Sequence, residues 1–486
     1  MKHNWLLVLL MIFLFYQCVD TEFRNPGNED LQFTEDTISF DTIFTTIGSI
    51  TRQFKVKNRS TNAIEVSSVQ LANANSFFHL NVDGEAGAKF KDITIPAGDS
   101  IYIFVEATID PTHEDNPVLI EDAIVFDWAG KSQAVQLQAY GQDVTIFKND
   151  TVETSVWAGK PCLILGNLWV KEGHTLTIEK GTVVYCHNTR DTLSINVMGK
   201  IDVKGTPEAP VIFRGDRLDE IWKGHKYDDV AGQWGGIYIY PSELKSTFSN
   251  CLIRNAIDGL RIGTYTSDIR TKVDLENTVI HNNTYSGLFA INAEMNIWNC
   301  QITNSGVFNF MVAAGGKYNV YQSTIANYYG LDRDTERSDS PCLAITNALQ
   351  ISDKYYAVND LTEASFYNCI VDGDFDGELA FQEAADYAFN FRFDHCLLKV
   401  DETIQDDFPD RFVSCYFNKD SLFRLISEWN YNFELDSASF AIDKGNPALL
   451  SLFPELQYDL IGNERRDGYP DAGAYEFSLL EENTDR

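Results

Sequence analysis

The chain has 486 residues, 44% of them hydrophobic and 13% aromatic, and its 71 acidic residues against 38 basic ones give a formal net charge of −33. The length exceeds one ordinary domain, and the apolar content is ample for large hydrophobic cores. A field of this sign repels phosphates, which argues against nucleic-acid binding, and an acidic surface mostly serves solubility.

The chain opens with the features of an export signal. Lys2 and His3 precede an apolar run, Trp5 to Phe15, that is too short for an ordinary membrane span. Residues 1–17 are therefore predicted to be a signal peptide, Cys18 a lipidated cysteine and residues 18–35 a flexible tether. The arrangement resembles the lipoprotein signals of Bacteroidetes, which implies a lipid anchor in the outer membrane and exposure at the cell surface. An ordinary secretory signal with a chance cysteine is the alternative.

Residues 36–144 are predicted to form a β-sandwich. About seven short runs of alternating apolar residues occur there, separated by turn signals such as Asp83-Gly84. Runs of this number and length are typical of an immunoglobulin-like sandwich. The stretch IPAGDSIYIFVEATIDP resembles the immunoglobulin-like domains that precede β-helices. The resemblance implies a spacer or an interaction module.

Residues 156–435 are predicted to form a solenoid with a repeat of about 20–27 residues. Small residues mark equivalent places in successive repeats, namely Cys251, Thr278, Cys300, Thr324, Cys369, Cys396 and Cys415. The runs around them are short and rich in β-branched and aromatic residues, so each repeat is predicted to be one coil of a parallel β-helix, with coils about 4.8 Å apart. The small residues then stack in an inward row. The residues Asn250, Asn277, Asn299 and Asn368 are predicted to form a neighbouring ladder of amides bonded to one another.

The first coils carry the clearest family signature. The stretches LGNLWVKEGHTLTIEKGTVVYC and LSINVMGKIDVKGTPEAPVIF have glycines where the chain must bend between faces. Together they resemble the opening coils of secreted right-handed parallel β-helix proteins of the pectate-lyase-like fold. The fold class is thus predicted to be all-β, a right-handed parallel β-helix behind an immunoglobulin-like sandwich. The resemblance specifies no activity, because function lives in sites placed on a fold.

A charged, irregular segment at residues 217–232 interrupts the repeat, and it is the candidate catalytic loop. Lys223 or His225 is a candidate general base, with Trp222 or Trp234 as a platform for a sugar ring. A solvated insertion without a role is the alternative.

Other catalytic signatures are missing from the sequence. Pectate lyases of this fold need an arginine base and an acidic calcium cluster on one face. Arg254, Arg261 and Arg270 are candidates for a basic face, with charge-paired surface arginines as the alternative. The sequence has no Ser/His/Asp signature, phosphate loop or zinc-ligand spacing.

A candidate calcium site lies at residues 372–383. Asp372, Asp374, Asp376 and Glu383 occupy positions 1, 3, 5 and 12 of the calcium-loop pattern, and Gly377 occupies position 6. The preceding FYNCIV predicts a strand rather than the helix of an EF-hand. An Asp/Gly-rich turn without metal is therefore the alternative to a Ca²⁺ site.

Eight cysteines follow Cys18, and the repeat cysteines among them, namely Cys251, Cys300, Cys369, Cys396 and Cys415, are predicted to be free thiols. An exported protein with an even number of cysteines often forms disulfides. Stacking on parallel coils, however, separates equivalent side chains by more than a disulfide spans. The repeat cysteines are therefore interpreted as small core residues.

Residues 436–480 are predicted to be a cap over the last coil. The stretch DLIGNERRDGYPDAGAYEF resembles the ending of many secreted Bacteroidetes β-helix proteins. Asp459, Arg465, Asp471 and Glu476 are predicted to form ion pairs over that end, because a solenoid must cover its terminal coil.

These observations together predict an exported, membrane-anchored surface lipoprotein. Its β-helix is predicted to be a non-catalytic module that binds a glycan or another macromolecule. A polysaccharide lyase or glycoside hydrolase of the pectate-lyase-like fold is the first alternative, and a structural spacer is the second.

Overall fold

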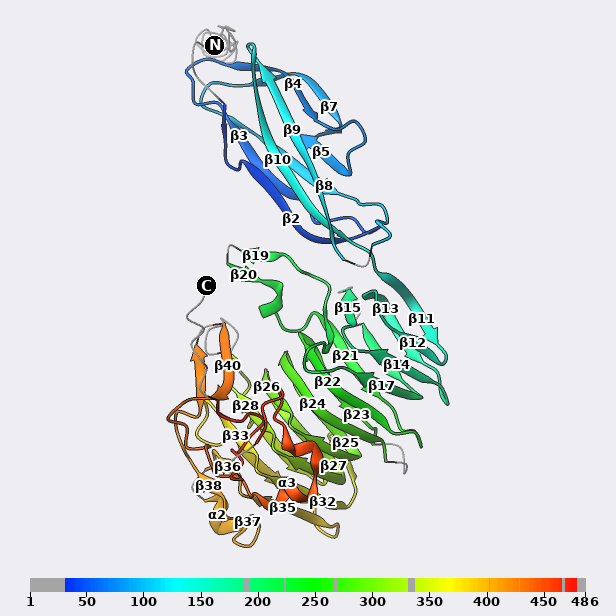
Figure 1. The fold of residues 1–486 in the computed structure, drawn as a ribbon, viewed down its shortest axis with the longest axis vertical. Coiled ribbons are helices and arrows are strands. Elements are labelled where there is room, and N and C mark those ends of the chain that lie inside the picture. Colours follow the sequence, from blue (N-terminus) through cyan, green and yellow to red (C-terminus); the bar gives the residue numbers. More distant parts are fainter. Residues whose placement is uncertain are drawn as a thin grey trace, which may run out of the picture. The chain divides into compact units, whose positions relative to one another are not determined.

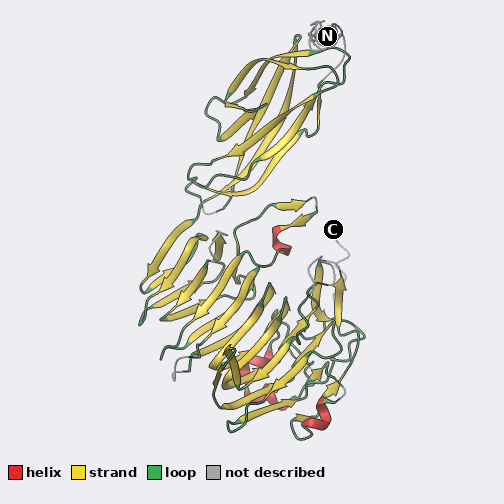
Figure 2. Ribbon diagram, turned by 180° about the vertical axis from the view of Figure 1, so that it is seen from behind, coloured by secondary structure: helices red, strands yellow, loops and turns green. Residues whose placement is uncertain are grey.

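The structure is a computed structural model that describes residues 31–114, 116–187, 193–222, 224–265, 270–330, 337–401, 403–427, 429–465 and 468–478 (Figure 1). Cys18 and Lys223 lie outside these residues. The chain divides into two compact units between Asp143 and Val144. Strands make up most of both units (Figure 2), which confirms the all-β prediction. Over the described ranges, no helix is both long and apolar enough to cross a membrane.

The first unit consists of two five-stranded sheets. The first sheet has the order β1 (Gln32–Phe33), β3 (Arg52–Lys57), β8 (Ser100–Ala107), β5 (Phe78–Val82) and β6 (Glu85–Gly87). The second has the order β2 (Thr37–Phe44), β10 (Lys131–Gln142), β9 (Val118–Trp128), β4 (Ile64–Leu71) and β7 (Lys89–Ile95). All pairings are antiparallel except β10 with β2. Alternating side chains of both sheets share one hydrophobic core.

The two sheets contain more strands than the apolar pattern predicts. Strand β7 has the sequence KFKDITI, in which only Phe90 and Ile95 are buried. Its lysines and aspartate hide the alternation because β7 is an edge strand with one face in solvent.

The second unit is a parallel β-helix. Its 24-stranded sheet pairs strands that belong to successive coils, and every pairing within it is parallel. Figure 1 shows these strands stacked in chain order. Each coil contributes to three faces, and the inward side chains of all three form one long core.

The strands of this sheet are β11 (Thr145–Val152), β12 (Ser155–Trp157), β13 (Cys162–Val170), β14 (Thr175–Glu179), β15 (Val183–His187), β16 (Ser194–Val197), β17 (Lys200–Lys204), β18 (Val211–Gly215), β21 (Trp234–Ile239), β22 (Ser246–Arg254), β23 (Ala256–Ile262), β24 (Lys272–Asn283), β25 (Ser286–Trp298), β26 (Gln301–Ser305), β27 (Phe308–Tyr321), β28 (Thr324–Asn327), β29 (Leu343–Thr346), β32 (Leu361–Tyr367), β33 (Ile370–Gly373), β34 (Leu379–Gln382), β35 (Phe389–Asp394), β36 (Leu397–Leu398), β37 (Phe412–Val413) and β38 (Tyr416–Phe417).

Three antiparallel hairpins and a few short helices complete this unit. The hairpins are β19 (Glu220–Trp222) with β20 (His225–Lys226), β30 (Ala348–Ser352) with β31 (Tyr355–Val358), and β39 (Phe423–Ser427) with β40 (Asn430–Leu435). The helices are α2 (Ile404–Asp407), α3 (Ala448–Leu452) and the 3₁₀ turns η1 (Tyr227–Asp229) and η2 (Pro454–Gln457).

The β-helix begins earlier and ends earlier than residues 156–435. The segment before residue 156 forms β11, which pairs in parallel with β13, although its side chains are mostly exposed and polar. A first coil buries only one face, so its strand lacks the alternation of the later ones. At the other end, β38 is the last parallel strand, and residues 423–435 form the hairpin β39–β40 instead.

The row of small residues is confirmed with one correction. Register aligns Cys251 with Thr278 on the next coil. The residue that aligns with Cys300 is Ser323 rather than Thr324. The Cys300 N–H donates a hydrogen bond to Ser323 Oγ at 3.1 Å. Thr324 is one position out of this row, because Gln322-Ser323-Thr324 offers two small residues side by side. Its Oγ1 instead accepts a hydrogen bond from the Ala474 N–H at 3.0 Å.

All eight cysteines from Cys162 to Cys415 are free thiols in the structure. Burial raises the pKa of Cys300 to about 12, so its reactive thiolate is scarce at neutral pH. We expect alkylation of the folded protein to spare the repeat cysteines, and Cys300→Ser or Cys369→Ser to lower the free energy of unfolding by roughly 1–3 kcal/mol, because each buries a hydroxyl. Mass mapping that finds disulfides among Cys369, Cys396 and Cys415 would contradict this prediction.

The predicted asparagine ladder stands at a left-handed bend. Asn250, Asn277, Asn299 and Asn368 have φ of 48°, 45°, 49° and 53°, and Gln322 occupies the same place with 45°. Asparagine tolerates this conformation better than most residues. The expected bonds between neighbouring amides are replaced at Asn299 and Asn368. Their amides donate to the carbonyls of Tyr458 (2.8 Å) and Asn446 (3.3 Å), because another segment covers the ladder.

That covering segment is the C-terminal one, and its position differs from the predicted cap. Residues 446–475 run across several coils along the side of the solenoid, reaching Asn299, Gln322 and Asn368. The predicted ion pair between Arg465 and Glu476 does form, at 2.5 Å. The last coils are covered instead by α2 and an aromatic cluster in which Phe408 packs against Phe391, with ring centroids 5.1 Å apart.

Candidate functional site

The loop at residues 217–232 is pinned to the solenoid by polar contacts. Arg214 and Arg254, on neighbouring coils, both form ion pairs with Asp228, the Arg254 pair at 3.6 Å. The Asn255 amide donates to the Val230 carbonyl at 2.6 Å, and the Gln233 amide donates to the Tyr227 carbonyl at 2.6 Å. These bonds hold η1 in place, so this loop is an ordered part of the coil.

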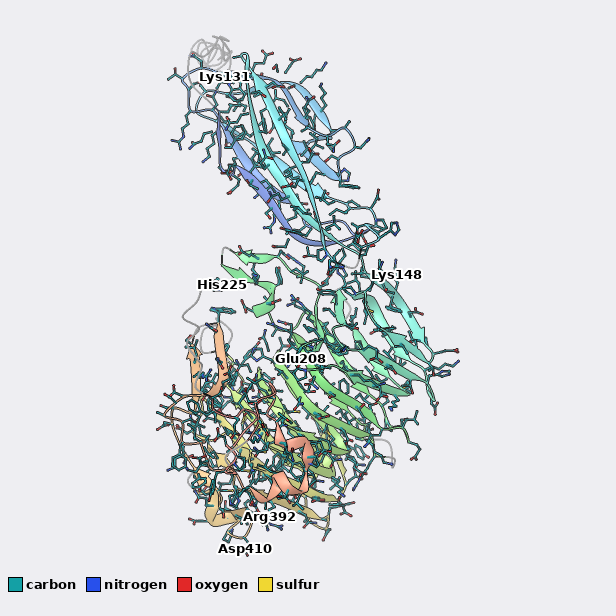
Figure 3. The ribbon with its side chains drawn as sticks, viewed as in Figure 1. Lys131, Lys148, Glu208, His225, Arg392 and Asp410 are labelled. Carbon is teal, nitrogen blue, oxygen red and sulfur yellow. The ribbon has the colours of Figure 1, made fainter. Side chains whose placement is uncertain are left out.

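Of the residues predicted for catalysis or sugar contact, the structure describes the side chains of His225 and Trp234, which lie in different surroundings. His225 lies at the end of the β19–β20 hairpin and packs edge-on against Trp429, with ring centroids 5.3 Å apart; Figure 3 labels His225. Trp234 is buried, and its indole N–H donates to the Arg254 carbonyl at 2.9 Å, so it cannot be a platform for a sugar. Trp234 belongs to the inward core together with Ile237 because the alternation of the strand breaks at Gly236, whose φ is 125°. Lys223 and the side chain of Trp222 lie outside the described residues.

Two titratable groups near this loop have shifted pKa values. Burial lowers the pKa of Arg254, and the nearby Asp228 opposes that shift. The hydrogen bond between His187 and Asp216 raises the pKa of His187. Burial accounts for the Arg254 shift and the hydrogen bond to Asp216 accounts for the His187 shift, so neither shift requires a ligand.

Two of the candidate calcium ligands are bound by side chains of the protein. Tyr328 donates its hydroxyl to Asp372 at 2.6 Å, and Arg337 forms an ion pair with Asp374. Asp376 is exposed, while Glu383 lies beyond strand β34, which carries it away from the turn. Across the described part of the chain, no three His, Cys, Asp or Glu side chains form a group that could hold a metal ion. The calcium prediction thus rests on the sequence pattern alone.

A pocket of about 250 Å³ lies on another face of the β-helix than the 217–232 loop. We call this face the pocket face, and it consists of β16, β21, β23 and the first halves of β25 and β27. The residues that line it are Tyr238, Ile239, Tyr240, Arg261, Gly263, Thr264, Tyr265 and Ile291. Because Ile237 and Ile239 point into the core, Tyr238 and Tyr240 point outward on the same strand.

Glycine lines this pocket at one position. Continuing the register of β21, β23 and β25 aligns Tyr240, Gly263 and Ile291 on successive coils. Gly263 has φ of 80°, and a Cβ there would approach the Ile291 carbonyl oxygen to 2.1 Å. The coil therefore requires glycine, and Gly263 adds no side chain to the pocket between Tyr240 and Ile291.

One cation lies in the pocket. The Arg261 guanidinium is 3.6 Å from the buried carboxylate of Asp258 and lies over the Phe289 ring, 5.1 Å from its centroid. Its side chain remains 41% exposed. The Asp258 carboxylate also accepts a hydrogen bond from Ser286 at 2.5 Å, which fixes its position. The pocket thus offers aromatic rings and a held guanidinium to a ligand.

The sequence analysis singled out Arg261 but missed the tyrosines. Their signal is the stretch GGIYIY, whose alternation places two aromatic side chains on the solvent side of one strand. Arg254 and Arg261 do not share a face, since Arg254 lies at the loop and Arg261 in the pocket. Arg270 bonds Thr362 at 3.1 Å and serves neither site.

Two family models match the second unit. Residues 150–244 match a pectate-lyase-like β-helix domain, and residues 226–378 match a right-handed β-helix region. These matches confirm the predicted handedness and the pectate-lyase-like type of the β-helix. No curated protein matches the chain.

Solved structures resemble the chain only in part. A family 123 glycoside hydrolase from Clostridium perfringens is 9% identical, with a TM-score of 0.17, over 23% of this chain and 26% of that one. The VesB protease of Vibrio cholerae is 14% identical, with a TM-score of 0.17, over 23% and 31%. A PapD-like domain of human CEP192 is 10% identical, with a TM-score of 0.16, over 26% and 94%. The chain thus spans about a quarter to a third of the first two.

Proposed function

We propose that this protein is an exported, lipid-anchored surface protein whose β-helix binds a glycan without cleaving it. The matches to a pectate-lyase-like β-helix domain and to a right-handed β-helix region support a polysaccharide-related role. In this proposal the first unit is an immunoglobulin-like spacer between the anchor at Cys18 and the β-helix. The localisation is the outer membrane, with the β-helix exposed at the cell surface.

The pocket on the pocket face carries the proposal. Ligand sites are concave, mostly apolar and equipped with a few placed polar groups, and this pocket combines three tyrosines with Arg261. The apolar face of a sugar ring packs against an aromatic ring, while hydroxyl oxygens accept hydrogen bonds from guanidinium N–H groups. Its volume of about 250 Å³ suits a small group such as one sugar residue.

A binding assay with tyrosine variants tests the proposal. The purified protein is titrated with pectate, alginate, glycosaminoglycans and neutral glucans, each with calcium and with a chelator. We expect at least one polysaccharide to bind, and Tyr238→Ala or Tyr240→Ala to weaken binding by about tenfold or more, which is about 1.4 kcal/mol. Tyr102→Ala, at an exposed tyrosine of the first unit, is the matched control and should bind like wild type. Equal affinity of all variants would refute the pocket as the site.

The lipid anchor makes a separate prediction. We expect the full-length product to partition into detergent, because lipid chains attached at Cys18 hold a protein at a membrane. Cys18→Ala should release it into the aqueous phase, and mass spectrometry should find acyl chains only in the wild type. A wild-type product that stays aqueous and is cut elsewhere would refute the anchor.

Cleavage of the polysaccharide is the alternative function. The observation that favours it is the group of Arg214, Arg254 and Asp228 at the base of the 217–232 loop, where burial lowers the pKa of Arg254. The same titrations followed by ultraviolet absorbance detect unsaturated uronate products. Turnover that disappears in His225→Ala or Lys223→Ala would replace the binding proposal with a lyase. Neither binding nor turnover would favour a structural spacer.

A further inference from the structure

We propose that the pocket face receives the end of a glycan chain rather than an internal segment of a polymer. This inference rests on the proposed function, and it names the part of the ligand that the site recognises. It follows from a contrast in exposure along one row of the pocket face.

The first residue of this row, Trp169, is exposed to solvent. Register aligns Trp169, Asn196, Tyr238 and Arg261 on four successive coils. Trp169 is 38% exposed, and its ring stacks with that of Tyr240 at a centroid distance of 6.1 Å. Asn196 is only 3% exposed, and its amide oxygen accepts a hydrogen bond from the Tyr240 hydroxyl at 3.3 Å. A ligand that lies along the solenoid axis can therefore contact Trp169, Tyr238 and Arg261, while Asn196 supports Tyr240.

The same row is covered on the next coils. Arg261 aligns with Phe289, and Phe289 aligns with Met311, so these side chains also point outward. Phe289 is nevertheless only 7% exposed, and Ile291, which lines the pocket, is only 2% exposed. Phe289 and Ile291 are buried because apolar side chains of another segment pack on them.

The covering segment is the β30–β31 hairpin. It leaves the solenoid after β29, and its side chains Leu349, Ile351 and Ala357 pack in one apolar cluster with Phe289 and Ile291. The hairpin thus forms a wall immediately past the pocket, at the coil of β25. Its tip carries Tyr355 and Tyr356, which are 56% and 48% exposed.

A linear polymer that lies along the row cannot continue past this wall. The coil spacing of about 4.8 Å lets successive sugars meet successive coils. The last sugar then occupies the pocket at Gly263, with the Arg261 guanidinium beside it to donate hydrogen bonds to its oxygens. Only a chain end fits, because an internal residue would require the chain to enter the space that Leu349 and Ile351 occupy.

The test compares one polysaccharide at two chain lengths. The best-binding polysaccharide of the panel is used intact and after partial acid hydrolysis, at equal total sugar concentration, with calorimetry or competition as the readout. If chain ends bind, the apparent affinity per sugar residue rises in proportion to the number of ends, about tenfold for a tenfold shorter chain. Borohydride reduction of the fragments shows whether the reducing end is the one bound.

Two results would overturn the inference. An affinity per sugar residue that stays constant or falls on hydrolysis shows that internal segments bind, and it leaves the proposed function intact. Absence of binding to any polysaccharide or fragment overturns the proposed function as well. A variant that replaces residues 349–357 by a short Gly/Ser turn gives an independent readout in protein that keeps its circular dichroism: preference for chain ends should be lost, and its persistence would contradict the role of the hairpin.

Discussion

The variant Glu378→Ala is expected to lose about 3–5 kcal/mol of its free energy of unfolding, the cost typical of removing one partner of a buried ion pair. The Glu378 side chain is fully buried and that of Arg337 is 2% exposed. The two Glu378 oxygens accept from the two terminal nitrogens of Arg337, at 2.7 and 2.5 Å. Without Glu378, the more exposed Asp374 is the remaining charged partner of the guanidinium among the described residues.

Two further variants show whether the loss comes from the unpaired charge. The double variant Arg337→Met/Glu378→Leu should recover much of the stability, because an apolar pair leaves no buried charge. Glu153→Ala removes an exposed ion pair with Lys171 at 2.8 Å and should leave the unfolding midpoint unchanged. Unfolding is followed by circular dichroism in urea. A Glu378→Ala variant as stable as wild type would contradict the prediction.

Arg465→Ala is expected to have the second largest effect, a loss of about 3 kcal/mol or more, because it leaves a buried carboxylate unpaired. The Arg465 side chain is fully buried. Its guanidinium forms an ion pair with the Glu476 carboxylate at 2.5 Å and donates a hydrogen bond to the Asn299 amide oxygen at 3.2 Å. Arg465 therefore holds the C-terminal segment against the asparagine ladder.

Hydrogen exchange locates this effect. Peptides from residues 446–475 and from the coils around Asn299 and Asn368 should lose protection in Arg465→Ala, whereas peptides of the first unit should not change. Arg465→Lys should recover only part of the loss, since an ammonium group lacks the planar fork. Arg392→Ala, at a half-exposed ion pair with Asp394, is the control. Unchanged protection of residues 446–475 would refute the anchoring role of Arg465.

Much of the coil architecture could be predicted from the sequence because it is encoded locally. The apolar alternation around Cys251, Thr278 and Cys300 predicts short strands, and strand periodicity is a property of neighbouring residues. The asparagines before those positions mark bends because a single residue with positive φ turns the chain there. Gly173 and Gly181 of the first coils act in the same way, each with φ of 75°.

The register between coils and the long-range contacts could not be predicted from these local patterns. The inward row passes through Ser323 rather than Thr324 because stacking on Cys300 chooses between two adjacent small residues. The calcium-loop spacing from Asp372 to Glu383 did not indicate that Tyr328 and Arg337, far away in the chain, bind two of its carboxylates.

The sequence by itself determined an all-β chain with a parallel β-helix, because strands and bends depend on residues a few positions apart. Only the tertiary structure decided where the C-terminal segment lies and where the pocket forms. The pocket needs Tyr240, Gly263 and Ile291 on three successive coils and a hairpin from residues 348–358 beside them. Those residues are separated by more than twenty positions in the chain, and only the stacking of coils brings them into contact.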